Sequence, residues 1–123
     1  MEEILAIFRK KKFYYINGYT TAIVLFAKFL ERKNLVLKNE CPTLCCCVAT
    51  SEMLFETDRI LLEKQFGVPV VNEYGASEVG LIAFENPKNK VWQLNTETLF
   101  VEILDENNNA VANGVEGKIV ITS

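Results

Sequence analysis

Four residues near the middle of the chain have side chains or backbone properties suited to nucleotide chemistry: Tyr74, Gly75, Ser77 and Glu78. The ring of Tyr74 offers a flat face on which a base could stack. Gly75 lets the backbone approach a ligand closely, and the Ser77 hydroxyl could meet a phosphate oxygen. Glu78 supplies the hard oxygen donor that Mg²⁺ prefers. The alternative is an ordinary strand-to-loop connection, because short motifs often arise by chance.

These residues follow Val70 and Val71, which belong to a short apolar segment. We therefore expect a strand that ends in a polar, glycine-flanked turn carrying the four residues. In open α/β sheets, ligands bind just beyond the carboxyl ends of the strands. The expected position of the turn is thus a ligand-binding position.

The segment Asn72-x-Tyr74-Gly75-Ala76-Ser77-Glu78 resembles the Tyr-Gly-x-Thr/Ser-Glu signature of adenylate-forming (AMP-binding) enzymes. The flanking sequence is most similar to the phenylacetate–coenzyme A ligase branch, which includes ligase-like proteins of capsular polysaccharide biosynthesis. The resemblance covers most of the chain, because three other stretches match in the same order. These are Ile16-Asn17-Gly18-Tyr19, Thr50-Ser51-Glu52, and Glu102-Ile103-Leu104-Asp105 leading to Gly117-Lys118-Ile119-Val120-Ile121-Thr122.

The resemblance implies a parent enzyme that activates a carboxylic acid with ATP and Mg²⁺ and passes the acyl group to coenzyme A. Tyr74 would stack under adenine, with Gly75 beside it, Ser77 would bond a phosphate and Glu78 would hold Mg²⁺. The turn Thr50-Ser51-Glu52 would wall the adenine. The expected ligands are thus a small-molecule carboxylate and a nucleotide.

Two further positions, Tyr19 and Gln93, contribute less to the resemblance. Tyr19 would lie near the acyl pocket, although a packed aromatic residue is the alternative. The family commonly has a His near Trp92, and Gln93 stands there instead, so a role carried by that His is not expected here.

Several parts of such an enzyme are not recognisable in the sequence. No Gly- and hydroxyl-rich run is present that could cradle a triphosphate, and neither the ribose-binding Asp segment nor the catalytic Lys can be identified. We therefore expect an internal segment of a longer enzyme that does not form an adenylate by itself. Two alternatives are a stand-alone nucleotide-binding module and an assembly subunit in which the Tyr-Gly-x-Ser-Glu turn is inert.

Composition excludes some classes of partner. The 123 residues carry a net charge of −3, which gives no electrostatic footprint for nucleic acid or for an anionic membrane. No apolar run is long enough to span a bilayer, and the first residues do not form a signal peptide. We expect a cytoplasmic protein.

The four cysteines, at positions 41, 45, 46 and 47, lack the paired spacing of a zinc site, and the chain contains no His. We therefore expect all four to be small buried apolar residues.

Periodicity indicates an α/β protein: a partial, mainly parallel sheet with flanking helices in βαβ units, followed by an antiparallel β meander. Asn17-Gly18 should end the first strand, and Ser51 should cap the helix that ends at Gly67. We assign residues 1–85 to the α/β part and 86–123 to the start of a β-barrel-like subdomain.

An exposed sheet edge predicts a homodimer. Helices are predicted over residues 2–12 and 20–33 and from Glu52 or Thr57 to residue 66. Strands are predicted over 13–16, 44–49, 68–71, 81–84, 91–94, 99–104 and 118–121.

Overall fold

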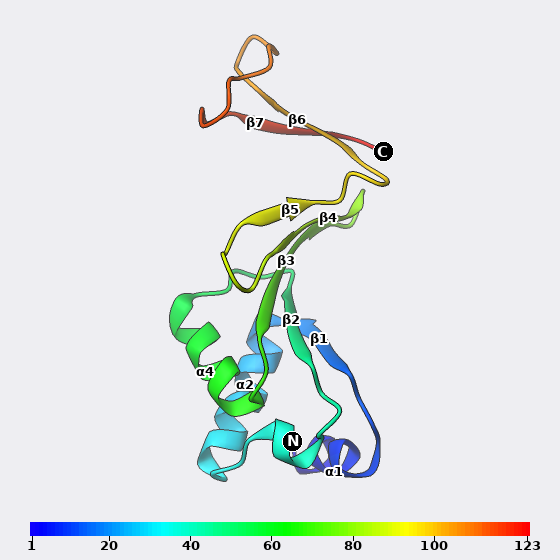
Figure 1. Ribbon diagram of the computed structural model, residues 1–123, viewed down its shortest axis with the longest axis vertical. Coiled ribbons are helices and arrows are strands. Elements are labelled where there is room, and N and C mark those ends of the chain that lie inside the picture. The colour runs from blue at the N-terminus through cyan, green and yellow to red at the C-terminus, as the bar shows by residue number, and fades with distance from the viewer.

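The computed structural model describes all 123 residues and shows an elongated molecule. The helices gather at one end, around the first three strands, and an antiparallel hairpin occupies the other end (Figure 1). Every helix precedes Gly67 in the chain. The helices are α1 (Glu2–Lys10), α2 (Thr20–Arg32), α3 (Leu37–Glu40) and α4 (Glu56–Phe66).

The first three strands form the parallel part of the sheet. Strands β1 (Tyr15–Tyr19), β2 (Cys46–Thr50) and β3 (Val70–Ala76) lie side by side in this order. Helix α2 lies on the connection from β1 to β2, and α4 on the connection from β2 to β3. These two βαβ units confirm the predicted fold class, and they bring the carboxyl ends of three strands to one edge.

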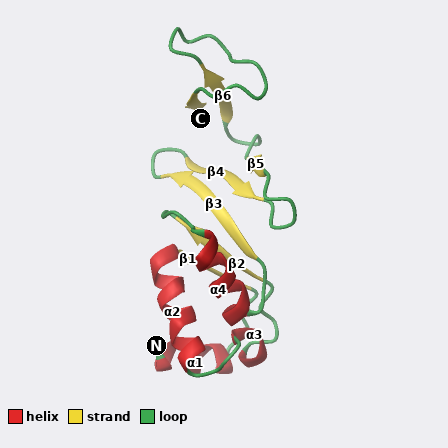
Figure 2. Ribbon diagram, turned by 90° about the vertical axis from the view of Figure 1, so that its left-hand side faces the viewer, coloured by secondary structure: helices red, strands yellow, loops and turns green.

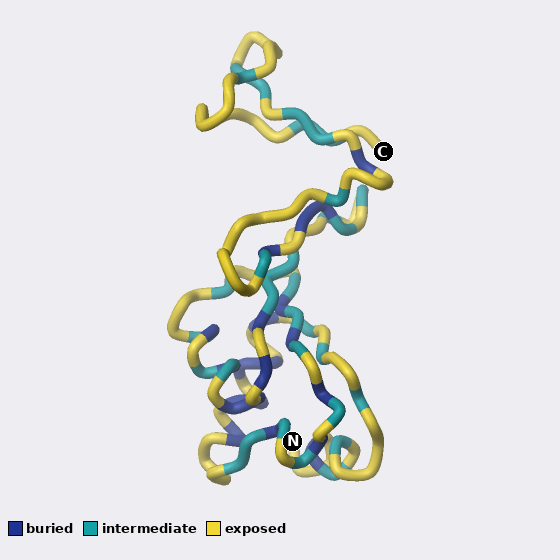
Figure 3. The backbone as a smooth tube through the Cα atoms, in the orientation of Figure 1, coloured by how far each residue is buried: buried dark blue, intermediate teal, exposed yellow.

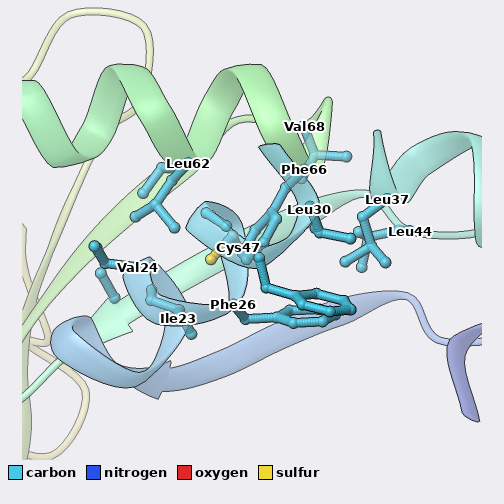
Figure 4. Packing of buried hydrophobic residues seen from close by; sticks show 14 of the residues in the cluster. Ile23, Val24, Phe26, Leu30, Leu37, Leu44, Cys47, Leu62, Phe66 and Val68 are labelled. Carbon is cyan, nitrogen blue, oxygen red and sulfur yellow. The ribbon is translucent and has the colours of Figure 1, made fainter. Parts of the chain in front are cut away.

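The main core lies between α2, α4 and one face of the parallel strands (Figure 4). Leu30, Cys47 and Phe66 are fully buried there. Helix α2 buries seven of its residues because apolar side chains cover more than one of its faces, as the sequence predicts. Figure 3 shows that burial is concentrated at this end of the molecule.

The chain after β3 is antiparallel, as predicted. Strands β4 (Gly80–Glu85) and β5 (Trp92–Leu94) extend the main sheet to five strands. Strands β6 (Phe100–Leu104) and β7 (Lys118–Thr122) form a separate two-stranded sheet. No helix accompanies these four strands (Figure 2). The division into residues 1–85 and 86–123 stays a prediction.

The prediction that Asn17-Gly18 ends the first strand is wrong. Both residues lie within β1, where Asn17 pairs with Val48 and Gly18 with Ala49. A Cβ atom at Gly18 would approach the Ile23 side chain of α2 to 3.0 Å. The glycine therefore allows α2 to pack closely on the strand, and pairing with β2 overrides the local preference for a turn.

The third long helix starts next to Thr57, the later of its two predicted positions, and not at Glu52. Helix α4 begins at Glu56 with Phe55 in the N-cap position, so Ser51 caps no helix. Ser51 instead has a φ of +66°, in the left-handed region that non-glycine residues seldom occupy. The helix does end at Gly67, in the predicted left-handed conformation with a φ of +69°.

The cysteines are only partly as expected. Cys41 and Cys47 are buried, whereas Cys46 is half-buried and Cys45 is exposed. The expectation for Cys45 is wrong: this residue lies just before β2 and is exposed. Burial raises the pKa of the Cys47 thiol to about 12, which keeps it protonated and unreactive. None of the helices has the length and apolar character needed to cross a membrane.

Candidate functional site at the tips of the parallel strands

Strand β3 is longer than its apolar residues indicate. The strand continues through Tyr74 and Gly75, which pair with Ala83 and Leu81 of β4. The ladder shifts by one residue between Tyr74 and Gly75, as in a β-bulge. The turn prediction is therefore wrong for Tyr74 and Gly75, which belong to β3, and confirmed for Ser77 and Glu78, which lie in the tight turn at residues 77–79 that leads to β4.

A solvent-open cleft of about 460 Å³ lies at the carboxyl ends of β2 and β3. Four of the residues predicted from the sequence line it together: Thr50, Ser51, Gly75 and Ser77. The other residues of its wall are Glu73, Ala76, Gly80 and Leu81. Two separate stretches of the sequence, about 25 residues apart, thus meet at one polar cavity, as expected at the tips of parallel strands.

Glu73 is a cleft residue that the sequence analysis did not identify. The hydroxyl group of Thr50 donates a hydrogen bond of 2.8 Å to Oε1 of Glu73, which joins the tips of β2 and β3. Glu73 could have been found from the alternation of side chains along a strand. Once β3 is extended to Ala76, Glu73 and Gly75 must share one face, and Tyr74 must take the other.

Glu52 supports the cleft wall from outside the cavity. Its carboxylate accepts a hydrogen bond of 2.6 Å from the backbone N–H of Thr21, and its carbonyl oxygen accepts one of 3.3 Å from the Thr20 hydroxyl. Glu52 therefore accepts hydrogen bonds at the N-terminus of α2, where the N-cap residue makes no side-chain hydrogen bond to the helix. The hydrogen bond from Thr21 lowers the pKa of Glu52 below its ordinary value.

Tyr19 ends β1 beside the cleft without lining it. It pairs with Thr50 in the parallel ladder, and 62% of its surface is exposed. Its ring is therefore not a packed core aromatic, which was the alternative considered for this residue. The position leaves the side chain free to contact a ligand that extends from the cleft across β1.

Glu78 lies in the turn after β3 and is exposed to solvent. The chain contains no group of three or more acidic, His or Cys side chains that could enclose a metal ion. Mg²⁺ bound with a nucleotide needs only one or two carboxylates, because water and phosphate oxygens complete its shell. Glu78, the single exposed carboxylate next to Ser77, could be one ligand of a Mg²⁺ ion that a nucleotide also binds. It could not hold a metal ion whose ligands all come from the protein.

Tyr74 lies on the opposite side of the sheet from the cleft. Its ring packs edge-on to Trp92 with the ring centroids 6.3 Å apart. Both rings line a second cavity, of about 340 Å³, between the main sheet and the β6–β7 hairpin. All eight residues of that wall are apolar, and they include Ile82 and Leu94. The structure therefore separates Tyr74 from Ser77, although the two are only three residues apart.

Solved structures share the fold of this chain over nearly its whole length. No protein-family model and no curated protein sequence matches it. VinN shares 21% sequence identity over 97% of the chain, with a TM-score of 0.77. 2-Hydroxyisobutyryl-CoA ligase, solved in complex with 2-HIB-AMP and CoA, shares 16% identity over 98% of the chain, with a TM-score of 0.80.

A third similar structure is the amide bond synthetase McbA from Marinactinospora thermotolerans, which shares 16% identity over 99% of the chain with a TM-score of 0.77. The chain has the fold of one part of these proteins. It spans only 31%, 27% and 25% of their respective lengths. A likeness at this level of identity establishes the fold, and the function has to be argued from the site.

Proposed function

We propose that the chain is a segment of an ATP-dependent acid–coenzyme A ligase of the adenylate-forming superfamily. The observation that carries the proposal is the coincidence of two independent signals at the end of β3. The signature Tyr74-Gly75-Ala76-Ser77-Glu78 occurs there, and the surrounding fold is shared with a CoA ligase that was solved with 2-HIB-AMP and CoA. The flanking sequence favours the phenylacetate–CoA ligase-like branch and its capsular polysaccharide relatives.

The cleft residues can share the binding of a nucleotide with Glu78 and Glu52, which lie next to the cleft in the sequence but do not line it. Ser77 can donate a hydrogen bond to a phosphate oxygen, and Glu78 can hold Mg²⁺ that such an oxygen shares. Gly75 adds no side chain to the cleft wall, and Thr50 and Ser51 form the part of the wall that comes from the end of β2. Glu52 fixes that wall by its bonds to α2. In the complete enzyme the metal ion offsets phosphate charge, and this chain supplies one of its ligands.

Adenine can contact the Tyr74 ring only where the ring is exposed. Tyr74 is 45% exposed, so part of the ring remains available for stacking. The cavity behind it is wholly apolar, and it would leave the polar edge of a base without hydrogen-bond partners. We therefore propose that the base stacks on the exposed part of Tyr74 with its polar edge toward solvent or toward the rest of the enzyme.

The alternative is a nucleotide-binding or assembly module without catalysis. It would use the same polar cleft at the tips of β2 and β3. Both functions predict that nucleotide contacts the cleft. The two functions differ in the reaction that they predict. If the chain is a ligase segment, the longer protein releases pyrophosphate when it is given ATP and an acid; if the chain is a module without catalysis, no pyrophosphate is released.

The ligase proposal is tested on the longer protein encoded when the reading frame is extended at both ends. We expect acid-dependent pyrophosphate release, and we expect Glu78→Gln to lower kcat/KM by about 10²-fold or more, as for loss of a preorganised charge-stabilising group. Glu3→Gln makes the same change in charge on α1, far from the cleft, and should leave the rate unchanged. Equal rates for the two variants would contradict the role of Glu78.

Isothermal titration of the 123-residue chain with magnesium-ATP tests whether it is incomplete. We expect binding weaker than micromolar, because the triphosphate finds no glycine-rich loop of backbone donors in this sequence. Micromolar affinity would instead favour the stand-alone nucleotide-binding module.

The sheet edges provide a route to self-association. Strand β1 pairs only with β2, so its outer edge has unpaired backbone groups. We propose that two copies of the chain pair through this edge at high concentration. Light scattering should then give a mass that rises above 14.0 kDa toward twice that value. A constant monomeric mass would exclude this partner.

A further inference from the structure

The β6–β7 hairpin, at the end of the molecule away from the helices (Figure 1), has one covered edge and one open edge. Residues 105–111 cover the outer edge of β6. There the backbone N–H of Asp105 donates a hydrogen bond of 2.9 Å to the Asn109 carbonyl oxygen, and the N–H of Val111 donates one of 3.0 Å to the Ile103 carbonyl oxygen. Strand β7 pairs with β6 and with no other strand, so its second edge is open.

The hydrogen bond from Val111 also shows which backbone groups of β7 are unpaired. Because the carbonyl oxygen of Ile103 points away from β7, Ile103 and its partner Ile119 form a non-hydrogen-bonded pair of the ladder. Such pairs alternate with hydrogen-bonded pairs, so Ile121 belongs to the first class and Val120 to the second. The N–H and C=O groups of Ile119 and Ile121 therefore point outward from the open edge, whereas those of Val120 point toward β6.

The side chains of β7 do little to protect this edge. Proteins usually block an edge strand with charged residues, Pro or a β-bulge. Strand β7 has no register shift against β6, and Lys118, at its start, is its only charged residue. Its three central residues, Ile119, Val120 and Ile121, are all β-branched. Ile119 is 48% exposed, so a strand placed alongside would also cover apolar surface.

A second copy of β7 fits the open edge in an antiparallel arrangement about a two-fold axis. Only the register centred on Val120 places all five residues of β7 opposite a residue of the other β7. In that register Val120 faces Val120 of the second copy, and Ile119 faces Ile121 of the second copy. The outward backbone groups then meet as hydrogen-bonded pairs, and the central side-chain pairs are all β-branched. Lys118 faces Thr122 of the second copy, so no like charges lie opposite each other.

We propose that β7 is a self-association surface at which two copies of the chain pair antiparallel about Val120. Pairing joins two two-stranded sheets into one four-stranded sheet, and an isolated two-stranded hairpin is only marginally stable in water. The pairing involves no residue of the cleft and does not depend on the ligase proposal. It also differs from pairing through β1, which lies in the other sheet. Two separate self-pairing edges on one chain allow assemblies larger than a dimer.

Amide hydrogen exchange of the ¹⁵N-labelled 123-residue chain, at micromolar and at millimolar concentration, tests this surface. The Val120 amide is bonded within the hairpin and should be protected at both concentrations. The Ile119 and Ile121 amides should exchange rapidly when dilute. Their exchange should slow about tenfold once about nine-tenths of the chains are paired, because only unpaired chains expose these groups. Pairing through β1 alone would leave both amides open.

Variants at Val120 test the register, because this residue faces its own counterpart. Val120→Glu should remove the slowed exchange of Ile121, since two carboxylates would lie opposite each other. Adding the unlabelled Val120→Lys chain to the labelled Val120→Glu chain should restore it, whereas adding unlabelled Val120→Glu chain should not. The matched control, Val115→Glu, adds the same charge at a 55% exposed residue before β7 and should leave the exchange unchanged.

Protection of the amide at position 120 shows in each variant that the hairpin is folded. A second variant, Ile119→Pro, removes an outward N–H and no hydrogen bond of the ladder, which is the position that Pro tolerates in an edge strand. It should reduce the slowing of exchange at Ile121, because one of the two hydrogen bonds in each Ile119–Ile121 pair is lost.

Three results would overturn self-pairing through β7. The first is equal exchange rates for Ile119 and Ile121 at the two concentrations, which would leave this edge to a strand of a different protein. The second is slowed exchange that survives both Val120→Glu and Ile119→Pro in folded hairpins. The third is a mixture of the Glu and Lys variants at position 120 that exchanges as fast as the Glu variant alone.

Discussion

A buried ion pair joins the parallel and antiparallel parts of the sheet, and its removal gives the sharpest test of the fold. The guanidinium of Arg59 on α4 contacts the carboxylate of Glu85 at the end of β4. Arg59 is 5% exposed and Glu85 is 8% exposed. Arg59 also donates a hydrogen bond of 2.9 Å to the carbonyl oxygen of Val70, at the start of β3. One side chain thus connects α4, β3 and β4.

The variant Glu85→Gln keeps the size of the side chain and removes its charge. Breaking a buried pair by removing one partner costs about 3–5 kcal/mol, because the remaining charge is left without compensation. We expect about 3 kcal/mol, the lower limit, since Arg59 keeps its bond to Val70 and a 3.5 Å contact with the exposed Glu56. At about 4 °C for each kcal/mol in a chain of this size, Tm should fall by about 12 °C.

Urea denaturation followed by circular dichroism measures this loss as a lower midpoint at an unchanged m-value. The matched control is Glu31→Gln, which breaks an exposed 3.2 Å pair with Lys64 and should cost less than about 1 kcal/mol. The double variant Arg59→Met with Glu85→Leu should recover most of the loss, because apolar replacement of a buried pair is often neutral. The stability of the double variant should remain below that of the original chain, because the Val70 carbonyl oxygen loses the hydrogen bond that Arg59 donates.

The result that would refute this reasoning is a cost for Glu85→Gln no larger than that for Glu31→Gln. It would mean that water reaches the guanidinium in solution and that the pair contributes as little as a surface pair. A double variant as unstable as Glu85→Gln alone would show instead that the bond to Val70 carries the effect. Either outcome would require a different account of how α4 is attached to the antiparallel strands.

Two further predictions concern the site. The pKa of Glu52 is lowered in the folded chain, so its hydrogen bond from Thr21 stabilises the fold fully above pH 4.5, the ordinary pKa, and is lost as the pH falls through the lower pKa of the folded state. The Thr21 amide resonance should therefore move upfield only below pH 4.5. Glu52→Gln should abolish this pH-dependent change in the resonance. Gly75→Ala should cost about 2 kcal/mol by urea denaturation, because its Cβ would approach the Gly80 carbonyl oxygen to 2.9 Å. Gly80→Ala meets open space at a φ of +75° and should cost only about 1 kcal/mol; the reverse order would contradict the hairpin geometry.

The layout of the fold is predictable because apolar runs and helix periodicity record which faces are buried. The sequence indicated α2 as a largely buried helix and the strand before Tyr74 as a parallel one, and both occur. Local signals failed where a distant segment supplied the missing partner. Asn17-Gly18 forms a strand because β2 lies beside it. The Glu52 carboxylate accepts a hydrogen bond from the distant Thr21 and does not lie in the first turn of a helix.

Buried polar residues are harder to predict, although helix geometry contains a clue. Arg59 lies three residues before Leu62 and seven before Phe66, so all three share one face of α4. A charged residue on an apolar face needs a buried partner. That partner, Glu85, is 26 residues later in the chain, and no local pattern identifies it. The same limit explains why Glu73 was missed, since its partner Thr50 lies 23 residues earlier.

The candidate site shows a more general limit of motif analysis. A motif is a set of adjacent residues, but adjacent residues in a strand point to opposite faces. Because β3 extends to Ala76, Tyr74 faces the apolar cavity, whereas Gly75 and Ser77 line the polar cleft. A nucleotide that uses both Tyr74 and Ser77 must therefore pass around the end of the strand. Its base would then lie on one face of the sheet and its phosphates on the other, which makes the turn at residues 77–79 the point about which it is held.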